Sequence, residues 1–394
     1  MLPLVAAVLA QSQAAPVPHL VLQDLEGKES ILATDNLRLR DPRERGAWVV
    51  RPAGFQALDG ERRSSGRARL VLVSGDELWG RVRGGTGESV LVELTSGVSL
   101  PIEISELVSL DVPDFIPSGQ RSSLPPAAEG DRLYRRTGGA LDAIDGTLEG
   151  FTDEGVRLQS VLGAKTFSWE EVAALRIEVL EDEPVSASAP EVPVHVALVD
   201  GSRLRGGLVS LDSDRCHLVL GGRHEVSFPL AAIAELTVAD GRLTYLSELE
   251  PVSETGRGTP FGDELGMTWP HRMDANVLGG PLRSGGKAYL RGVGMHAPSR
   301  LVFRLDGEPR VLRGRVGIDD SARINGPAAR GSVVFRVWLD GKRAWESALL
   351  RGGDEPALLP ALDLAGAREL ALEVDPAGDF AGDRANWLGV VLVR

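Results

Sequence analysis

Side chains that could recognise a hydroxyl-rich ligand gather in the last third of the sequence. They are two indole rings, an imidazole, two acids, a guanidinium and an amide, at Trp269, His296, Asp319, Asp320, Arg384, Asn386 and Trp387. A pyranose ring presents an apolar CH face and a rim of hydroxyl groups, so its binder needs an aromatic platform beside fixed donors and acceptors. These residues supply the required groups, but their types alone do not show that a sugar binds.

Each of these side chains also has a purely structural interpretation. Trp387 begins an apolar strand pattern and therefore fits a core position as well as a platform. Trp269 lies in a loop, where both interpretations stay open. His296 lies at a corner, where a histidine often bonds to backbone carbonyl groups, and the pair Asp319 and Asp320 could cap a turn.

Three acids near the end of the chain could hold a cation. Asp375, Asp379 and Asp383 are spaced four apart in a glycine-bearing loop, and carboxylate oxygens are the ligands that calcium prefers. The spacing does not match an EF-hand, so a solvated acidic turn is the alternative. We expect no other cofactor.

Catalytic motifs give little support for an enzyme. The sequence has no Gly-x-Ser-x-Gly, no His-Glu-x-x-His and no phosphate-binding loop, and its six histidines are scattered. A glycosidase needs two acids on either side of the scissile bond. Asp319 or Asp320 with Asp383 is the pair that could serve, so a glycoside hydrolase remains an alternative to a non-catalytic protein.

Strand patterns predict how these residues are positioned. In residues 291–304, Gly292 and Gly294 permit positive φ or close backbone approach, and an alternating strand follows His296. Residues 333–339 also alternate and lead into the turn pair Asp340-Gly341. Strands and loops over about 150 residues predict a two-sheet sandwich of jelly-roll type.

The C-terminal third resembles the NPCBM family of carbohydrate-binding modules. The resemblance covers residues 246–394 and rests on GGPLRSGGKAYLRGVGMHAPSRLVFRL at 279–305, VGIDD at 316–320, GSVVFRVWLDGKRAWESALLRGGDEP at 331–356 and VDPAGDFAGDRANWLGVVL at 374–392. It implies a galactose-binding-like β-sandwich that recognises a sugar through loops at one end. It also implies that such domains accompany glycoside hydrolases.

One motif departs from this family. Where the family pattern is His-Ala-Asp-Trp, this chain has Arg384-Ala385-Asn386-Trp387. Arginine and asparagine can hydrogen-bond sugar hydroxyls, but they cannot supply anionic metal ligands. The substitution puts in doubt any sugar or metal contact made by the replaced groups.

An internal repeat of about 60 residues precedes the sandwich. Each copy has a polar turn, a leucine and a glycine, a strand, and three apolar residues spaced three apart. The copies run from Ser74-Gly75-Asp76 through Leu78 and Gly80 to Ile104, Leu107 and Leu110; from Asp145-Gly146 through Leu148 and Gly150 to Trp169, Val172 and Leu175; and from Asp200-Gly201 through Leu204 and Gly206 to Leu230, Ile233 and Leu236.

Each copy reads as two hairpins and a short 3₁₀ turn, which predicts a small SH3-like or Sm-like barrel. This resemblance is one of layout only. A partial earlier copy in residues 19–51 matches poorly. Such barrels serve many unrelated functions, so they imply none by themselves.

The predicted organisation therefore has eight parts. They are a signal peptide at 1–15, an N-terminal β segment at 16–64, small barrels at 65–112, 136–181 and 194–245, linkers at 113–135 and 182–193, and the sandwich at 246–394. With Gly 47 and Pro 24 in 394 residues, an all-β chain is expected.

Charge and cysteine content narrow the class of protein. A formal net charge of −13 opposes nucleic-acid binding, and beyond the N-terminal stretch no segment is apolar enough to span a membrane. The single cysteine, Cys216, excludes an intrachain disulfide. We expect a secreted, periplasmic or cell-surface protein that binds a glycan or polysaccharide. The alternative is a structural protein of the cell envelope whose barrels contact other proteins and whose sandwich binds no sugar.

Overall fold

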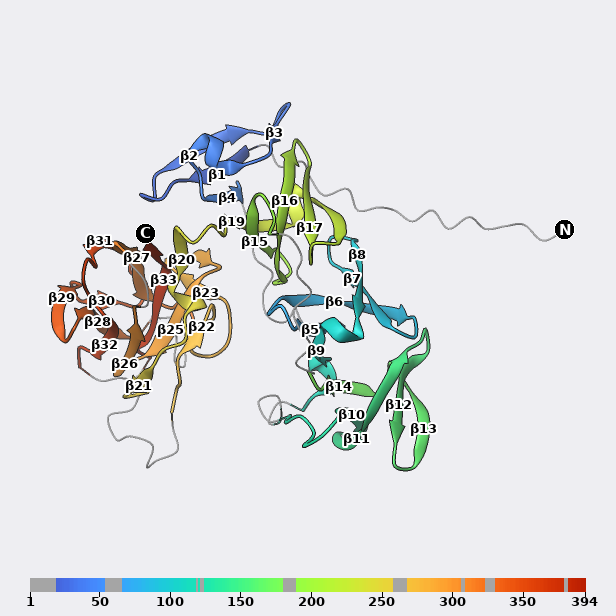
Figure 1. Cartoon of the computed structure of the whole chain (residues 1–394). Helices are drawn as coiled ribbons and strands as arrows, with labels where there is room; N and C mark the ends of the chain where they lie inside the picture. The colour runs from blue at the N-terminus through green and yellow to red at the C-terminus, as the bar shows by residue number, and fades with distance from the viewer. Residues whose placement is uncertain are drawn as a thin grey trace. The chain divides into compact units, whose positions relative to one another are not determined.

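The structure is a computed structural model that describes residues 19–53, 66–117, 120, 124–179, 189–257, 268–305, 309–322, 330–378 and 382–394. The chain divides into two compact units, one mainly from residues 19–237 and the other mainly from residues 238–394. Both consist of strands and short 3₁₀ helices, which confirms the all-β prediction (Figure 1). Within these described ranges, no helix is long and apolar enough to cross a membrane. The predicted signal peptide lies outside them.

Three segments of the first unit share one order of strand pairing. In each, the first strand pairs with the second and fifth, the second with the third, and the third with the fourth. Repeat 1 comprises β5 (Ala68–Leu72), β6 (Glu77–Gly85), β7 (Ser89–Leu94), β8 (Ser99–Glu103) and β9 (Leu107–Asp111); repeat 2 comprises β10 (Asp131–Thr137), β11 (Ala140–Phe151), β12 (Gly155–Ser160), β13 (Gly163–Ser168) and β14 (Val172–Arg176); repeat 3 comprises β15 (Pro193–Leu198), β16 (Arg203–Asp212), β17 (Arg215–Leu220), β18 (His224–Pro229) and β19 (Ile233–Val238). The SH3-like identity of these repeats stays a prediction.

Alternating apolar residues place each strand on the core. In β7, for example, Val90, Val92 and Leu94 are buried while the residues between them are more exposed. The 3₁₀ helices η2 (Ile104–Glu106) and η5 (Leu230–Ala232) lead into the fifth strands of repeats 1 and 3. The apolar spacing of three at the end of each copy thus marks the approach to the fifth strand.

The register of repeat 2 differs from the one predicted from its Asp-Gly pair. Asp145 and Gly146 lie inside β11, and the turn falls instead at Gly138 and Gly139, which have φ of 54° and 95°. The first hairpin of repeat 2 is therefore longer than its counterparts, because Leu133 pairs with Ile144, whereas Leu70 pairs with Leu78.

The structure aligns Gly146, and not Gly150, with Gly80 and Gly206. A Cβ on any of the three would lie within 2.8 Å of a carbonyl oxygen on the neighbouring third strand: 2.8 Å at Gly80, 2.3 Å at Gly146 and 2.7 Å at Gly206. These positions require glycine because the two backbones approach closely there. The Asp145-Gly146 pair suggested a turn, but it lies within β11 where the backbones of β11 and β12 approach closely.

Fifth strands join the repeats in pairs. Strand β9 of repeat 1 pairs antiparallel with β14 of repeat 2, with Leu110 opposite Leu175, and Arg176 forms an ion pair of 2.6 Å with Asp111. Because Leu110 and Leu175 are equivalent residues, the two repeats are related there by an approximate two-fold axis.

The N-terminal segment joins repeat 3 through the same kind of strand pairing. Its strands are β1 (His19–Gln23), β2 (Glu29–Ala33), β3 (Arg38–Leu39) and β4 (Val49–Pro52), with η1 (Pro42–Arg45) between the last two. β1 pairs with β2 and β4, as a first strand pairs with a second and a fifth. β4 then pairs with β19 of repeat 3, with Val50 opposite Leu236. The segment therefore follows part of the repeat pattern.

Repeats 1 and 3 meet through a different surface, which we name the turn face. It consists of the turn between the first and second strands, the start of the second strand, and the turn between the third and fourth strands. Glu77 of β6 lies opposite Arg203 of β16, and these two residues are equivalent in the repeat. A second approximate two-fold axis therefore passes between them.

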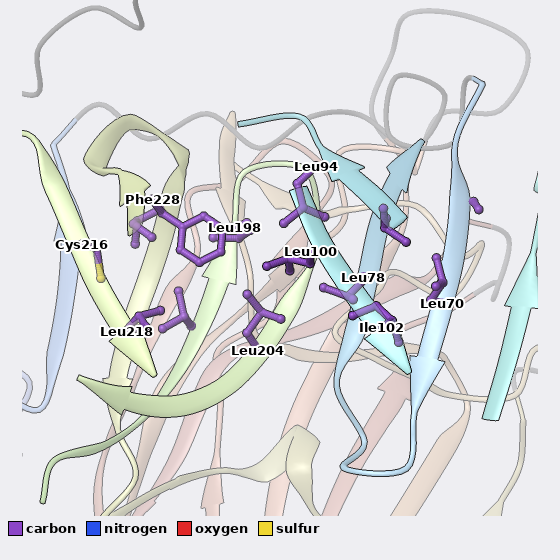
Figure 2. Close-up of a cluster of buried hydrophobic side chains, with 14 of the residues drawn as sticks. Leu70, Leu78, Leu94, Leu100, Ile102, Leu198, Leu204, Cys216, Leu218 and Phe228 are labelled. Atoms are coloured by element: carbon purple, nitrogen blue, oxygen red, sulfur yellow. The ribbon is translucent and has the colours of Figure 1, made fainter. Parts of the chain in front are cut away.

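Hydrogen bonds across this axis are reciprocal. The peptide N–H of Trp79 donates to Ser202 Oγ at 2.9 Å, and the peptide N–H of Arg205 donates to Asp76 Oδ1 at 3.1 Å. Trp79 occupies the same position in repeat 1 as Arg205 does in repeat 3, and Asp76 the same position as Ser202. The apolar cores on either side are continuous, as the side chains in Figure 2 show.

The second unit is a sandwich of two antiparallel sheets. One contains β22 (Arg272–Met273), β25 (Gly292–His296), β33 (Arg384–Val393), β27 (Val311–Ile318) and β31 (Ala357–Asp363), with β20 (Leu243–Tyr245) also on β33; the other contains β21 (Ser253–Thr255), β26 (Ser299–Arg304), β32 (Glu369–Pro376), β28 (Ser332–Leu339) and β29 (Lys342–Glu346), with β30 (Leu350–Arg351) on β28. A separate hairpin is formed by β23 (Leu282–Ser284) and β24 (Lys287–Tyr289). This confirms the predicted sandwich.

Two boundaries differ from the predicted ones. β10 begins at Asp131, inside the predicted linker 113–135, since its charged sequence hid an alternating strand. β20 lies in the predicted third barrel, 194–245, but pairs with β33 and so belongs to the sandwich.

Candidate functional site

One end of the sandwich collects most of the predicted site residues. β25 ends at His296, β33 begins at Arg384 and β27 ends at Ile318, and antiparallel pairing brings these three termini together. β22 pairs with β25 so that the chain before Arg272, including Trp269, runs toward the same end. The sequence separates these residues, and sheet register brings them together.

The central feature of this end is a stack of two rings. The indole of Trp269 lies on the imidazole of His296, with ring centroids 4.8 Å apart and planes inclined by 19°. Trp269 is half-buried, and its peptide N–H is fixed by the carbonyl of Arg257 at 2.9 Å. Stacking orients the indole. Of the two tryptophans predicted for the site, Trp269 is the one that stays partly exposed.

His296 has a defined protonation state. Its Nδ1 lies 2.8 Å from the carbonyl oxygen of Ala297, which can only accept, so Nδ1 carries the proton. Burial lowers the pKa of His296, and the nearby Arg384 guanidinium lowers it further. The ring is therefore neutral at pH 7, and Nε2 is an acceptor. The contact with a backbone carbonyl is also the structural alternative considered for this histidine.

Arg384 lies opposite His296 in the register of β25 and β33. Its guanidinium donates to the carbonyl oxygen of Ser321 in the loop after β27. The side chain is half-buried, and a guanidinium has five N–H donors in all. Trp269 and Arg384 thus place an aromatic face and a cationic donor at one end of the sandwich, and His296, which is only 5% exposed, stacks on the indole.

Asp319 and Asn386 lie beneath this surface. Asp319 is 2% exposed and Asn386 is fully buried, so neither presents its polar group to a ligand on the surface. Asn386 Nδ2 donates to Asp319 Oδ2 at 2.6 Å. The prediction that they contact a sugar is wrong for this structure, because the sheet packing encloses both side chains.

Asp319 is instead the acceptor that holds the loops together. Its Oδ1 accepts from Asn276 Nδ2 at 3.1 Å and from the Ser321 N–H at 2.9 Å, and its Oδ2 also accepts from the Arg283 N–H at 3.1 Å. The bond to Ser321 is the turn cap considered as the structural alternative. This carboxylate therefore supports the site from below.

Trp387 lies in the core. It is fully buried, and its ring packs perpendicular to that of Phe335 from the opposite sheet, at a centroid distance of 5.2 Å and an interplanar angle of 88°. The prediction of a platform role is wrong, and the alternative of a core residue holds, because residue 387 falls on the inward face of β33.

Asp320 and the acidic trio have structural contacts. Asp320 Oδ2 accepts from the Gly286 N–H at 3.0 Å. Asp375 forms an ion pair of 2.7 Å with Arg336, and Asp383 Oδ1 accepts from the Ser332 N–H at 2.7 Å. The third acid of the trio, Asp379, lies outside the described residues.

No group of three or more His, Cys, Asp or Glu side chains suited to a metal occurs in the part of the chain that the structure describes. The calcium site therefore stays a prediction.

The glycines of the stretch 291–304 fulfil the prediction of positive φ or close backbone approach. Gly292 and Gly294 lie within strand β25. A Cβ on Gly292 would lie 2.1 Å from the carbonyl oxygen of Trp387, and one on Gly294 would lie 2.3 Å from that of Ala275. Close approach holds at both glycines, and Gly292 also has a positive φ of 150°.

Sequence reasoning missed Asn276. It is 5% exposed, donates to Asp319, and accepts from the peptide N–H groups of Leu278 and Gly280 at 3.1 and 2.9 Å. An asparagine shortly before two glycines is typical of such a turn, and this signal could have found it.

Residues 242–393 match the family model described as NPCBM/NEW2 domain. This part of the chain therefore matches the family that its sequence blocks predicted. A curated relative, Alpha-1,3-galactosidase B of Akkermansia muciniphila, is 34% identical over 121 residues, which are 30% of this chain and 14% of the relative. The matched segment thus spans a small part of that relative.

Solved structures of CBM51 domains are also similar to the chain. One is the CBM51 from Clostridium perfringens GH95 in complex with methyl-galactose, with 25% identity, coverage of 38% of this chain and 99% of that chain, and a TM-score of 0.33. Another is the tandem CBM51 modules of Sp3GH98 from Streptococcus pneumoniae SP3-BS71, with 17% identity, coverage of 82% and 87%, and a TM-score of 0.32.

Proposed function

We propose that the protein binds a glycan, without turning it over, at the end of the sandwich that carries Trp269, His296 and Arg384. The observation that supports this most directly is the stack of Trp269 on His296. It fixes an indole at the loop end of the part that matches the NPCBM/NEW2 family, on a largely buried neutral imidazole and near a guanidinium. A sugar ring can lie on such an indole while its hydroxyl groups bond to the neighbouring groups.

The acids of this region favour binding over hydrolysis. Both oxygens of Asp319 already accept two hydrogen bonds each from protein donors, so this carboxylate is poorly suited to act as a base or nucleophile. The alternative of a glycoside hydrolase would rest on Asp320 with Asp383. Turnover of chromogenic glycosides that Asp320→Asn abolishes would support that alternative and overturn the non-catalytic proposal.

A glycan array probed with the full chain tests the proposal. Terminal galactosides are the first ligands to examine, because the relative with 34% identity is named as a galactosidase. A folded protein that binds no glycan on a broad array would overturn the proposed function and favour the structural alternative.

A matched pair of tryptophan variants locates the site. Trp269→Ala should weaken glycan binding by about 1–3 kcal/mol, roughly 5- to 150-fold in Kd, because a stacked ring is lost. Trp345→Ala is the control, since Trp345 lies on β29, the edge strand of the sheet opposite the one that carries His296 and Arg384. Equal losses in both variants, or none in either, would place the site elsewhere.

The proposed binding implies that the protein acts outside the cytoplasm, as a secreted, periplasmic or surface protein. The apolar and small residues in 1–15 support export. Detection of the chain only in the cytoplasmic fraction of its native cells would contradict this. In an exported protein, the repeats would serve as a spacer for the sandwich or contact envelope proteins.

A further inference from the structure

The turn face of repeat 2 pairs with no other repeat within the described residues, although the same surface joins repeats 1 and 3. In that internal junction, Asp76 is 8% exposed and Ser202 is fully buried. Register aligns Asp142 of repeat 2 with these two residues, and Asp142 is half-buried while the following Ala143 is exposed. The surface that is covered in both repeat 1 and repeat 3 is therefore open in repeat 2.

The start of β11 has a free edge. Residues 140–146 pair with β10 on one side only, and β12 joins β11 from Thr147 onward. Thr137 and Ala140 flank a two-residue turn with positive φ at both glycines, which makes them a hydrogen-bonded pair. Alternation along the antiparallel ladder then directs the peptide groups of Leu141, Ala143 and Asp145 away from β10. These groups could pair with another strand.

The other turn of this face carries two exposed aliphatic side chains. Val161 and Leu162, between β12 and β13, have exposed fractions of 101% and 96%, the largest among the large hydrophobic residues in the described ranges. In repeat 1 the equivalent turn contacts its partner repeat, since the Thr95 N–H donates to Asp200 Oδ2 at 3.3 Å. An apolar turn tip beside an open strand edge is typical of an interaction surface.

We propose that two copies of this chain form a two-fold dimer through the turn face of repeat 2, with their β11 edges paired antiparallel about Ala143. The occupant is a second copy because repeats 1 and 3 already use this face to pair with an equivalent face. Ala143 is equivalent to Glu77 and Arg203, which lie opposite each other at the internal axis.

The charges of β11 are compatible with this register. Pairing about Ala143 places Leu141 opposite Asp145 and Asp142 opposite Ile144 of the second copy, so no acid faces an acid directly. Asp142 and Asp145 also have arginine partners on β10, since they form ion pairs of 2.7 Å with Arg135 and 2.5 Å with Arg132. The dimer would cover Val161 and Leu162 on both copies.

A cysteine placed on the axis tests the register. In the full chain, Ala143→Cys should form a disulfide-linked dimer on mild oxidation, because hydrogen-bonded antiparallel partners have Cα atoms about 5.5 Å apart, within disulfide range. Thr147→Cys is the control on the same strand, since its two copies would lie about 25 Å apart. The native Cys216 is fully buried and does not compete. No covalent dimer from Ala143→Cys, or equal yields from both variants, would overturn the register.

Sedimentation equilibrium of the full chain tests the surface. The wild-type protein should show a concentration-dependent mass approaching two chains, and Leu162→Lys should raise the dimer dissociation constant at least about tenfold, through loss of apolar burial. Leu358→Lys, at an exposed leucine of the sandwich, is the control and should have no effect. A wild-type chain that stays monomeric at all soluble concentrations, or a dimer that Leu162→Lys leaves intact, would overturn the proposal.

Discussion

Asn386 donates a hydrogen bond of 2.6 Å to Asp319, and both side chains are enclosed by the sandwich. Asn386 lies on β33, while Asp319 follows β27, so the bond ties two neighbouring strand ends together. Asn276 extends the cluster to the loop after β22. The arginine and asparagine that distinguish this chain from the family pattern therefore have separate roles. Arg384 lies at the surface, and Asn386 supports the loops.

Removing the Asp319 carboxylate should destabilise the sandwich. Asp319→Ala leaves two side-chain amides and two peptide N–H groups without their acceptor, so we expect the free energy of unfolding to fall by about 3 kcal/mol or more. Urea unfolding followed by tryptophan fluorescence measures this. Asp363→Ala is the control, since the exposed Asp363 accepts one bond, from Ala365. Similar small losses in both variants would contradict the supporting role.

Acid should weaken the sandwich through His296. Burial and Arg384 lower the pKa of His296 below its ordinary 6.5, so the unfolded chain binds this proton more readily than the folded one. The free energy of unfolding should therefore fall as the pH drops below about 6.5. Comparing urea unfolding at about pH 7.5 and about pH 5.5 should show a smaller drop for His296→Gln than for the wild type. An equal drop in both proteins would assign the effect to other groups.

The register of repeat 2 can be tested at its glycine. Gly146→Ala should destabilise the protein by about 1–3 kcal/mol, because the added Cβ would lie 2.3 Å from the Gln159 carbonyl oxygen. Gly87→Ala is the control, since no atom lies within 4 Å of its Cβ position. Thermal unfolding measures both. A harmless Gly146→Ala would favour the predicted register, in which Asp145 and Gly146 form a turn.

Cys216 should be inert in the folded protein. Burial raises the pKa of its thiol to about 12, so almost no thiolate is present at neutral pH. A chromogenic disulfide reagent should react slowly with the native chain and release one equivalent after unfolding in urea. Rapid labelling of the native protein would contradict the buried position of this strand. His217→Ala, on the same strand but partly exposed, should leave the slow labelling unchanged.

Local patterns were sufficient to predict much of the fold. Period-two alternation predicted strands, because it exposes one face and buries the other whatever the rest of the chain does. The three-residue spacing of Ile104, Leu107 and Leu110 predicted a 3₁₀ turn, and the structure places Ile104 in η2 but both leucines in β9. The Asp-Gly pair at 145–146 did not mark a turn. A dipeptide signal describes preference only, and a longer hairpin in repeat 2 overrode it.

What the sequence determined by itself was the all-β class, the sandwich of the last third and its family, since alternation and ordered motifs are properties of the chain. Only the tertiary structure decided which candidate side chains reach the surface. Asp319 meets Asn276 and Asn386, which are 43 and 67 residues away, and Trp387 meets Phe335 of the opposite sheet. Such contacts depend on how sheets pair and pack, and residue spacing does not encode them.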